Sequence, residues 1–292
     1  MKMLLQLIVS GMLLGGIYAL LSVGLSLMLG VSKFIHFAHG DVVMAGMYMA
    51  YGCYLLFGLN AYFSWPIVLL MAVALGVVIY AFAHFTIGKS DLNQVLFTMG
   101  LSMILQNTAL LMFKSDFKSV PSTFSSGLQV GGIYIAISSL ITFVIAMLAT
   151  AAFLVFIHYS STGRAMRAVG DDRNAAMLVG IPVGTIDLIT FCVGTGMACL
   201  SGGLLMSIYP TTPTLGSGYN LIAWVTVVLG GLGHLQGALM SAMLIGICET
   251  TSGFYLGADL RQVVYFAMFV AVLVFKPEGL FSGVNMKKVK RS

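Results

Sequence analysis

Three side chains that could hold a metal ion or move a proton lie close together near the N-terminus. His36, His39 and Asp41 form the pattern H-x-x-H-x-D. Imidazole nitrogens and carboxylate oxygens are ordinary zinc ligands, but a zinc site needs three or four converging ligands with hydrogen-bonded support behind them. One short segment supplies all three groups here. The pattern therefore favours a polar break between two apolar segments, near a transport pathway or its gate, over an intramembrane metalloenzyme, which remains the alternative.

Glu249 is the one acidic residue inside the apolar run 245–251. A charge at the middle of a bilayer costs about 2.5–3.5 kcal/mol on insertion scales, so such a residue is paired, protonated or exposed to water. Glu249 is accordingly a candidate for a transport pathway. The alternative is a position near the membrane interface, where this cost disappears.

Residues 83–90 read AHFTIGKS and fit a relaxed phosphate-loop pattern. A phosphate loop needs glycine-rich backbone after a strand, so that its free amides can surround the phosphates. Here the middle residues are bulky and the preceding segment is apolar and helical. The pattern indicates the end of a helix with an interfacial lysine, and no nucleotide site.

Segment 158–187 concentrates charge in an otherwise apolar chain. Its alanines recur at helical spacing with arginines between them, and we expect Gly163 to end the preceding span, Gly170 to separate two short helices and Gly180 to end the second. Helix faces made of small side chains can dock closely into a groove, and arginines can pair with carboxylates of a partner. The alternative is a solvated connector. Its charged residues are Arg164, Arg167, Asp171, Asp172, Arg173 and Asp187.

The elements that position these groups must lie in lipid. The chain is 59% hydrophobic and 8% charged, with a mean hydropathy of +1.02, whereas soluble domains carry about 25% charge. In lipid every backbone amide must be paired internally, which leaves helices or closed barrels, and long apolar runs select helices. The many glycines inside these runs predict close helix–helix packing.

We predict an all-α polytopic membrane protein, a bundle of about eight or nine transmembrane helices forming one transmembrane domain over 1–292. Gly230, Gly231 and Gly233 interrupt the C-terminal third, which predicts a discontinuous or re-entrant element lining the pathway; one long kinked helix is the alternative. The predicted spans are 4–30, 42–58, 65–87, 93–113, 132–157, 186–208, 220–231, 235–252 and 261–276.

Charge asymmetry predicts the orientation. Segment 158–187 and the basic residues Lys287, Lys288, Lys290 and Arg291 are expected on the cytoplasmic side, and the N-terminus outside. The basic tail indicates a cytoplasmic flank and no nucleic-acid partner. The four cysteines show no metal-ligand spacing and are expected to be packing residues. No polar segment is long enough to form an ATPase domain. We therefore expect that this chain is not an enzyme and that it needs no cofactor.

Four stretches in order resemble the permeases of branched-chain amino-acid ABC importers, the LivH-like family. They are GIYAL at 16–20 with FAHGD at 37–41, RAMRA at 164–168 with Gly180 and Ile181, GGLG at 230–233 with Gly237 and Ala238, and KPEGLF at 276–281. The family usually has Asn at the position of His36, and a basic residue ahead of Gly163 where this chain has His158-Tyr159-Ser160-Ser161. These departures bear on the solute and on the edge of the docking surface.

The resemblance implies a transmembrane permease subunit in the bacterial inner (cytoplasmic) membrane that moves branched-chain or related small amino acids by alternating access. It implies two ABC ATPase subunits, a second permease subunit, homologous or identical, and a periplasmic substrate-binding protein. An ion-coupled secondary transporter and a passive channel remain alternatives. The residues expected to dock the ATPase are Gly163, Arg164, Arg167, Ala168, Asp172, Ala175, Ala176 and Gly180.

Overall fold

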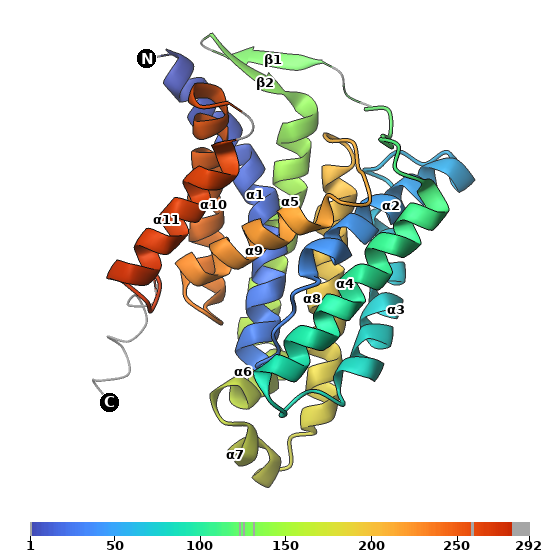
Figure 1. The fold of residues 1–292 in the computed structure, drawn as a ribbon, viewed down its shortest axis with the longest axis vertical. Coiled ribbons are helices and arrows are strands. Elements are labelled where there is room, and N and C mark those ends of the chain that lie inside the picture. The colour runs from blue at the N-terminus through green and yellow to red at the C-terminus, as the bar shows by residue number, and fades with distance from the viewer. Residues whose placement is uncertain (1, 123, 125, 131, 258–259, 282–292) are drawn as a thin grey trace.

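The computed structural model describes residues 2–122, 124, 126–130, 132–257 and 260–281. The basic residues from Lys287 to Arg291, which we expect on the cytoplasmic side, lie outside this range. Eleven helices and one two-stranded hairpin make up the described part of the chain (Figure 1). They are α1 (Lys2–Val31), α2 (His39–Phe57), α3 (Trp65–Ala83), α4 (Asp91–Phe113), β1 (Gly127–Val130), β2 (Ile133–Ala136), α5 (Ile137–Tyr159), α6 (Ser161–Asp171), α7 (Arg173–Leu178), α8 (Val183–Leu205), α9 (Gly216–Gly230), α10 (Leu235–Tyr255) and α11 (Arg261–Phe275).

The helical polytopic fold is confirmed. Within the described residues, seven helices are long and apolar enough to cross a membrane, and α9 and α11 are shorter apolar helices of 15 residues each. The structure adds an antiparallel hairpin, β1–β2, that pairs Gly127 with Ala136. This hairpin takes up the first residues of the span expected over 132–157, so the helix begins at Ile137 instead.

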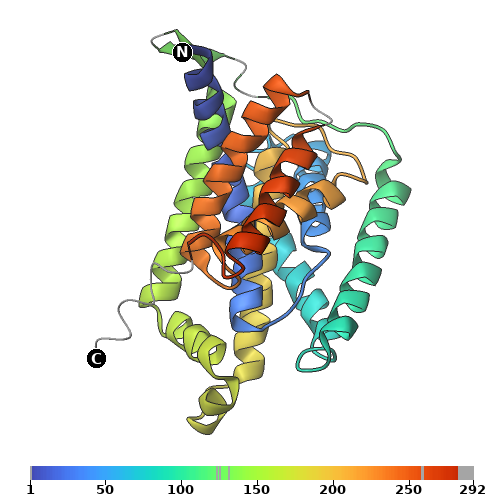
Figure 2. The same cartoon turned by 60° about the vertical axis from the view of Figure 1, so that its left-hand side comes forward.

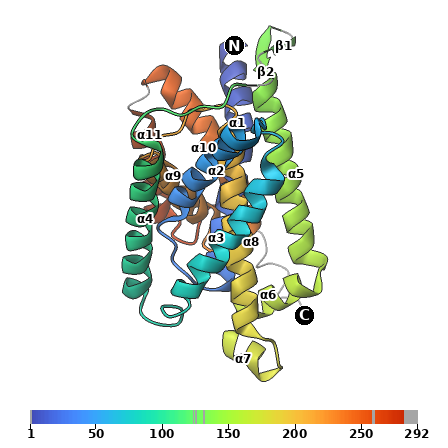
Figure 3. The same cartoon turned by 90° about the vertical axis from the view of Figure 1, so that its right-hand side faces the viewer.

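The bundle has two distinct ends. The N-terminus and the hairpin lie at one end, called here the hairpin end, and α6 and α7 lie at the other (Figures 1 and 2). Helices α1 and α8 form the centre, where 78% of the most apolar window of each is buried. Helix α4 stands at the edge opposite α5 (Figure 3), with only 11% of its window buried. Most of the exposed side chains of α4 are apolar, among them Leu96, Met103 and Leu111, as expected for a surface that faces lipid.

Glycines bring the central helices into backbone contact. A Cβ added to Gly11 of α1 would lie 2.5 Å from Cα of Ile247 in α10, and one added to Gly15 would lie 2.8 Å from Cα of Met243. A Cβ added to Gly202 of α8 would lie 2.0 Å from the Val43 carbonyl oxygen of α2. In lipid the hydrophobic effect does not drive helices together, so van der Waals contact at such close approaches stabilises their association. The predicted close-packed glycine interfaces are therefore confirmed.

Helix α9 lies across the middle of the molecule and does not continue into α10 (Figure 1). Gly231 and Gly233, with φ of +97° and +76°, turn the chain between the two helices. The N-terminus of α9 meets the buried N-terminus of α2, where a Cβ on Gly40 would lie 2.2 Å from the Gly216 carbonyl oxygen. The structure therefore has the interrupted C-terminal element that the glycines predict, as two separate helices and not one kinked helix.

Candidate docking surface and translocation pathway

Helices α6 and α7 together form a foot at the end opposite the hairpin, referred to below as the foot (161–178). Ser160 begins α6 by accepting a hydrogen bond from the Gly163 amide at 2.8 Å. Gly163 therefore lies inside α6, and the expectation that it ends the preceding span is wrong. A Cβ at Gly163 would lie 2.3 Å from the Ile157 carbonyl oxygen, so this glycine lets α6 turn back tightly against α5.

The first two arginines of the foot bind the end of α5. Arg164 donates to the Tyr159 carbonyl at 3.0 Å, and Arg167 donates to the carbonyls of Ile157 and His158. The last carbonyls of a helix lack intrahelical partners, and basic side chains satisfy them favourably. These contacts are internal to the chain, and the expected pairing of the two arginines with a partner's carboxylates stays a prediction.

Two more charged residues of the foot are used within the chain. Asp172 caps α7, its Oδ1 accepting from the amides of Asn174 and Ala175 at 2.9 and 3.0 Å. Arg173 makes a two-pronged ion pair with Asp187 of α8, whose side chain is 1% exposed. The boundary between the two short helices therefore falls at Asp172 and not at Gly170, where we expected it.

An apolar tip is what the foot presents outward. Met177, Leu178 and Val179 are 51%, 89% and 77% exposed, while Ala176 beside them is 2% exposed and packs inward. Ala175 is exposed and Ala168 is half-buried. Gly180 ends the tip with a left-handed φ of +84° and open space around its α-carbon. The sequence analysis did not predict this apolar tip, because it considered only the charged and small residues of the segment. The signal was the apolar run Met177-Leu178-Val179, which stands just before Gly180 and Pro182.

Backbone contacts join the foot to the break between α9 and α10. A Cβ at Gly170 would lie 2.9 Å from the Gly30 carbonyl oxygen at the end of α1, and one at Gly30 would lie 3.1 Å from the Gly233 carbonyl oxygen. Gly279 abuts the Gly231 amide, and the Leu280 amide donates to the Leu229 carbonyl at 2.8 Å. Gly230 packs directly on Gly237. The glycines that we expected along the pathway thus make helix-to-helix contacts in this structure.

The pattern H-x-x-H-x-D occupies the junction of α1 and α2. His36 and His39 are fully buried with their rings edge to face, and His39 contacts the Leu21 carbonyl at 3.1 Å. Asp41 accepts a hydrogen bond from Gln106 of α4 at 2.9 Å and lies against Gly216. Within the residues that the structure describes, no group of three or more histidine, cysteine, aspartate or glutamate side chains is arranged to bind a metal ion.

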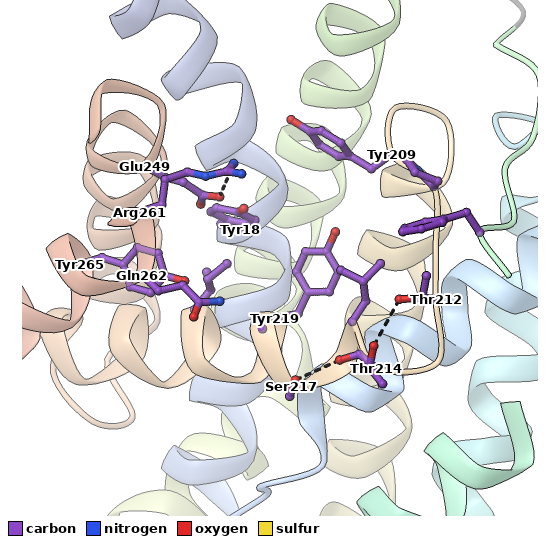
Figure 4. A pocket seen from close by; sticks show the side chains of 15 residues that line it. Tyr18, Tyr209, Thr212, Thr214, Ser217, Tyr219, Glu249, Arg261, Gln262 and Tyr265 are labelled. Carbon is purple, nitrogen blue, oxygen red and sulfur yellow. Dashed lines mark hydrogen bonds and ion pairs between the residues drawn. The ribbon is translucent and has the colours of Figure 1, made fainter. Parts of the chain in front are cut away.

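A cavity of about 490 Å³ with several polar side chains in its wall lies in the half of the molecule toward the hairpin end. Figure 4 shows Glu249 and Arg261 on one side of it and Thr212, Thr214 and Ser217 on the other, with Tyr219 between them. Of the seven pathway candidates, Glu249 is the one that lines this cavity. Helix α9, whose N-terminal turns contribute Ser217, Gly218 and Ile222, lies along the wall that faces α2.

Sequence comparison identifies relatives of this chain. A profile of the family described as "Branched-chain amino acid transport system / permease component" matches residues 7–273. The chain belongs to this family. It is 32% identical to the high-affinity branched-chain amino acid permease protein LivH of Salmonella typhimurium, over 98% of this chain and 97% of the relative. It is 29% identical to BraD of Pseudomonas aeruginosa, over 98% of both chains, and 26% identical to a probable LivH of Methanocaldococcus jannaschii, over 99% and 95%.

Membership makes this chain a multi-pass membrane permease component of the ABC-importer type and not an enzyme. Such permeases work with ATPase and substrate-binding partners, which agrees with a foot that projects beyond the bundle. No solved structure matches the permease significantly. The assignment of residues to partner docking or to the pathway rests on the geometry described above.

Proposed function

We propose that this chain is the transmembrane subunit of an ABC importer that carries branched-chain or closely related amino acids across a bacterial inner membrane. It works with two ATPase subunits, a second permease subunit and a periplasmic substrate-binding protein. Binding of ATP closes the ATPase pair, and the difference in ATP affinity between the open and closed pairs biases the permease between outward-facing and inward-facing states.

The observation that carries this proposal is the construction of the foot. Four of its five charged residues make contacts within the chain, and its base touches α1 at Gly30. Its tip is an exposed apolar cluster of Met177, Leu178 and Val179. A rigid element with an apolar tip suits a groove on a soluble ATPase, since burying a leucine side chain contributes about 1.5–3 kcal/mol. The arginines that cap α5 keep the tip fixed relative to the bundle.

In this arrangement the hairpin end faces the periplasm and the foot faces the cytoplasm. The cavity with Glu249 then lies on the side from which a binding protein delivers solute, and the contact of α9 with Gly40 of α2 separates it from the cytoplasmic half. The segment 206–215 between α8 and α9 is the part of the cavity rim that a binding protein reaches first.

Reconstitution tests the proposal directly. Liposomes containing the whole transporter are expected to take up leucine only with ATP and binding protein present. The variant Leu178→Ala should lower uptake about tenfold, because a loss of about 1.4 kcal/mol of docking energy corresponds to a factor of ten. Leu232→Ala is the matched control, since Leu232 is 65% exposed in the turn between α9 and α10 but lies outside the foot.

Two results would overturn the proposal. Uptake by this chain alone under an ion gradient would identify a secondary transporter, and wild-type uptake in Leu178→Ala would remove the docking role of the tip. A cysteine introduced at the exposed position Ala175, in a background without the four native cysteines, should react only with reagents that reach the cytoplasm. Labelling from outside intact cells would reverse the assigned orientation.

A further inference from the structure

A short segment that follows α4 reaches the cavity from the hairpin end. Residues 114–120, called here the strap, leave the end of α4 and run toward the hairpin (Figure 3). Phe117 in the middle of the strap lines the cavity, whose other wall residues come from α1, α9, α10, α11 and segment 206–215. Its side chain is nevertheless 75% exposed. Because the phenyl ring borders the cavity and is largely exposed, it stands at the mouth of the cavity.

The bundle holds both ends of the strap. Phe113, the last residue of α4, stacks on Tyr48 of α2 with ring centroids 4.5 Å apart, and Val120 at the other end is 5% exposed. Lys114 turns the chain away from α4 with φ +60° and ψ −172°, a conformation that is almost confined to glycine. Other residues keep such a conformation only where the surrounding structure imposes it, often at ligand clamps and switch segments. The strap is thus constrained to bring Phe117 to one place.

One pair of backbone hydrogen bonds fastens the middle of the strap to the rim of the cavity. The Lys118 amide donates to the Thr211 carbonyl at 3.0 Å, and the Thr211 amide donates to the Lys118 carbonyl at 2.8 Å. Residues 115–122, all of which the structure describes, make no other backbone hydrogen bond to the rest of the described chain. Segments with few backbone hydrogen bonds open at low free-energy cost, and active-site lids are drawn from them. Lifting the strap therefore breaks this pair of bonds while Phe113 and Val120 stay in place.

We propose that the strap is the entrance gate of the cavity, and that it lifts from segment 206–215 each time a solute with an aliphatic side chain enters. Phe117 covers the mouth while the Lys118–Thr211 pair is intact, and it moves aside when the pair breaks. The ring shares the cavity wall with the apolar side chains of Leu215 and Ile222. Burial of apolar surface there favours an aliphatic side chain. This inference rests on the proposed function, which makes the hairpin end the side of delivery.

A disulfide tests whether the strap must move. Antiparallel residues that exchange two hydrogen bonds have Cα atoms about 5.5 Å apart, which a disulfide can bridge. Lys118→Cys with Thr211→Cys is made in the background without the four native cysteines, and the complete transporter is placed in liposomes with its ATPase and binding protein. Leucine uptake should be normal when this variant is reduced, fall at least about tenfold when it is oxidised, and return on reduction, because gate opening is needed for every transport cycle.

The matched control crosslinks the hairpin at the same end of the molecule. Leu128 and Ile135 lie opposite each other on β1 and β2, so Leu128→Cys with Ile135→Cys should form a disulfide as well. Leucine uptake by this control should be the same in the oxidised and reduced states. Equal uptake in both states of the strap variant, with its disulfide verified by mass spectrometry, would overturn the gate.

A second measurement needs no disulfide. Ile222 is 5% exposed and lines the cavity, so Ile222→Cys in the same background reports entry of a membrane-impermeant thiol reagent added outside intact cells. Phe117→Ala should speed this reaction severalfold, because the ring no longer covers the mouth. Phe63→Ala should not, since it removes a ring that is 65% exposed in the loop between α2 and α3 and does not line the cavity. Equal reaction rates in the two variants would overturn the gate.

Failure of the proposed function looks different from failure of the gate. If the proposed function were wrong, wild-type liposomes would take up no leucine with ATP and binding protein present. If only the gate were wrong, wild-type uptake would be intact and the oxidised strap variant would transport as well as the reduced one.

Discussion

The two ends of this permease each carry an ion pair between neighbouring helices, and the pairs differ in how completely they are satisfied. At the foot, Arg173 holds Asp187 through both carboxylate oxygens, and Asp187 is 1% exposed. In the cavity, Arg261 stays 3.8 Å from Glu249, whose second oxygen has no hydrogen-bond partner in the described structure. A guanidinium–carboxylate pair is therefore bonded through both carboxylate oxygens at one end and held at a longer distance at the other.

This difference shows why a list of charged residues predicts function poorly. A charge whose hydrogen bonds are complete within the chain has little left to offer a partner, whereas a charge with open capacity in a cavity does. The foot carries five charged residues, but its tip is apolar. In the cavity, Glu249 has one carboxylate oxygen without a hydrogen-bond partner among the described residues.

Breaking the satisfied pair should have the largest effect on stability. Arg173→Ala leaves the Asp187 carboxylate buried without its partner, and removal of one member of a buried pair costs about 3–5 kcal/mol. Asp187→Asn should cost less, because Arg173 is 36% exposed on its side chain and can be solvated. Thermal unfolding of the purified protein measures both. Equal, small shifts in the two variants would contradict the distinction drawn between the ends.

The contact between α2 and α9 lies between the two ends. Disrupting it should have the second-largest effect on stability. Gly40→Ala places a methyl group about 2 Å from the backbone of Asn220 and Gly216, and overpacking of this kind costs about 1–3 kcal/mol. We expect a lower unfolding temperature and reduced uptake. Gly218→Ala is the control on α9, since a Cβ there meets nothing within 4 Å. Equal behaviour of the two variants would show that α9 does not depend on this contact.

Asp172→Ala tests whether this charge of the foot acts within the chain. Loss of an N-cap costs about 0.5–2 kcal/mol, and the loss should be confined to α7. Faster hydrogen exchange of the Asn174 and Ala175 amides is the expected result, with a fall in coupled uptake because the apolar tip is no longer held. Asp171→Ala changes the neighbouring exposed charge and serves as the control. Unaltered exchange in Asp172→Ala would disprove the cap.

Glu249→Gln should have the smallest effect on stability. The pair with Arg261 is too long for a hydrogen bond, so its removal should change stability by less than about 1 kcal/mol, in line with weakly coupled pairs. The unfolding temperature should therefore stay close to that of wild type. A drop as large as that of Arg173→Ala would show that the cavity pair is structural after all.

The helical spans were predictable from the sequence because the period and length of apolar runs determine them. The predicted span 93–113 became α4 at Asp91–Phe113, and 235–252 became α10 at Leu235–Tyr255. The glycine break at 230–233 was also visible, since glycine is the residue that permits the positive φ found there. These features depend on local chemistry and on lipid as the solvent.

The partners of individual side chains were not predictable in the same way. Arg167 bonds to a carbonyl ten residues earlier, and Arg261 faces Glu249 only because α11 packs beside α10. Such contacts depend on how helices fold back on one another, and spacing along the chain does not reveal them. The hairpin at 127–136 was missed for a related reason, since its residues are apolar enough to read as the start of α5.

The chain of glycines that runs from Gly170 through Gly30 to Gly233 has a mechanical consequence. Contacts made by backbone atoms cannot be relieved by a change of side-chain rotamer, because no rotamer exists at these positions. A displacement of the foot of even a few tenths of an ångström must therefore be passed on to the end of α1 and to the turn before α10. In the docking that we propose, ATP-driven motion of the foot therefore reaches this junction with little loss of amplitude.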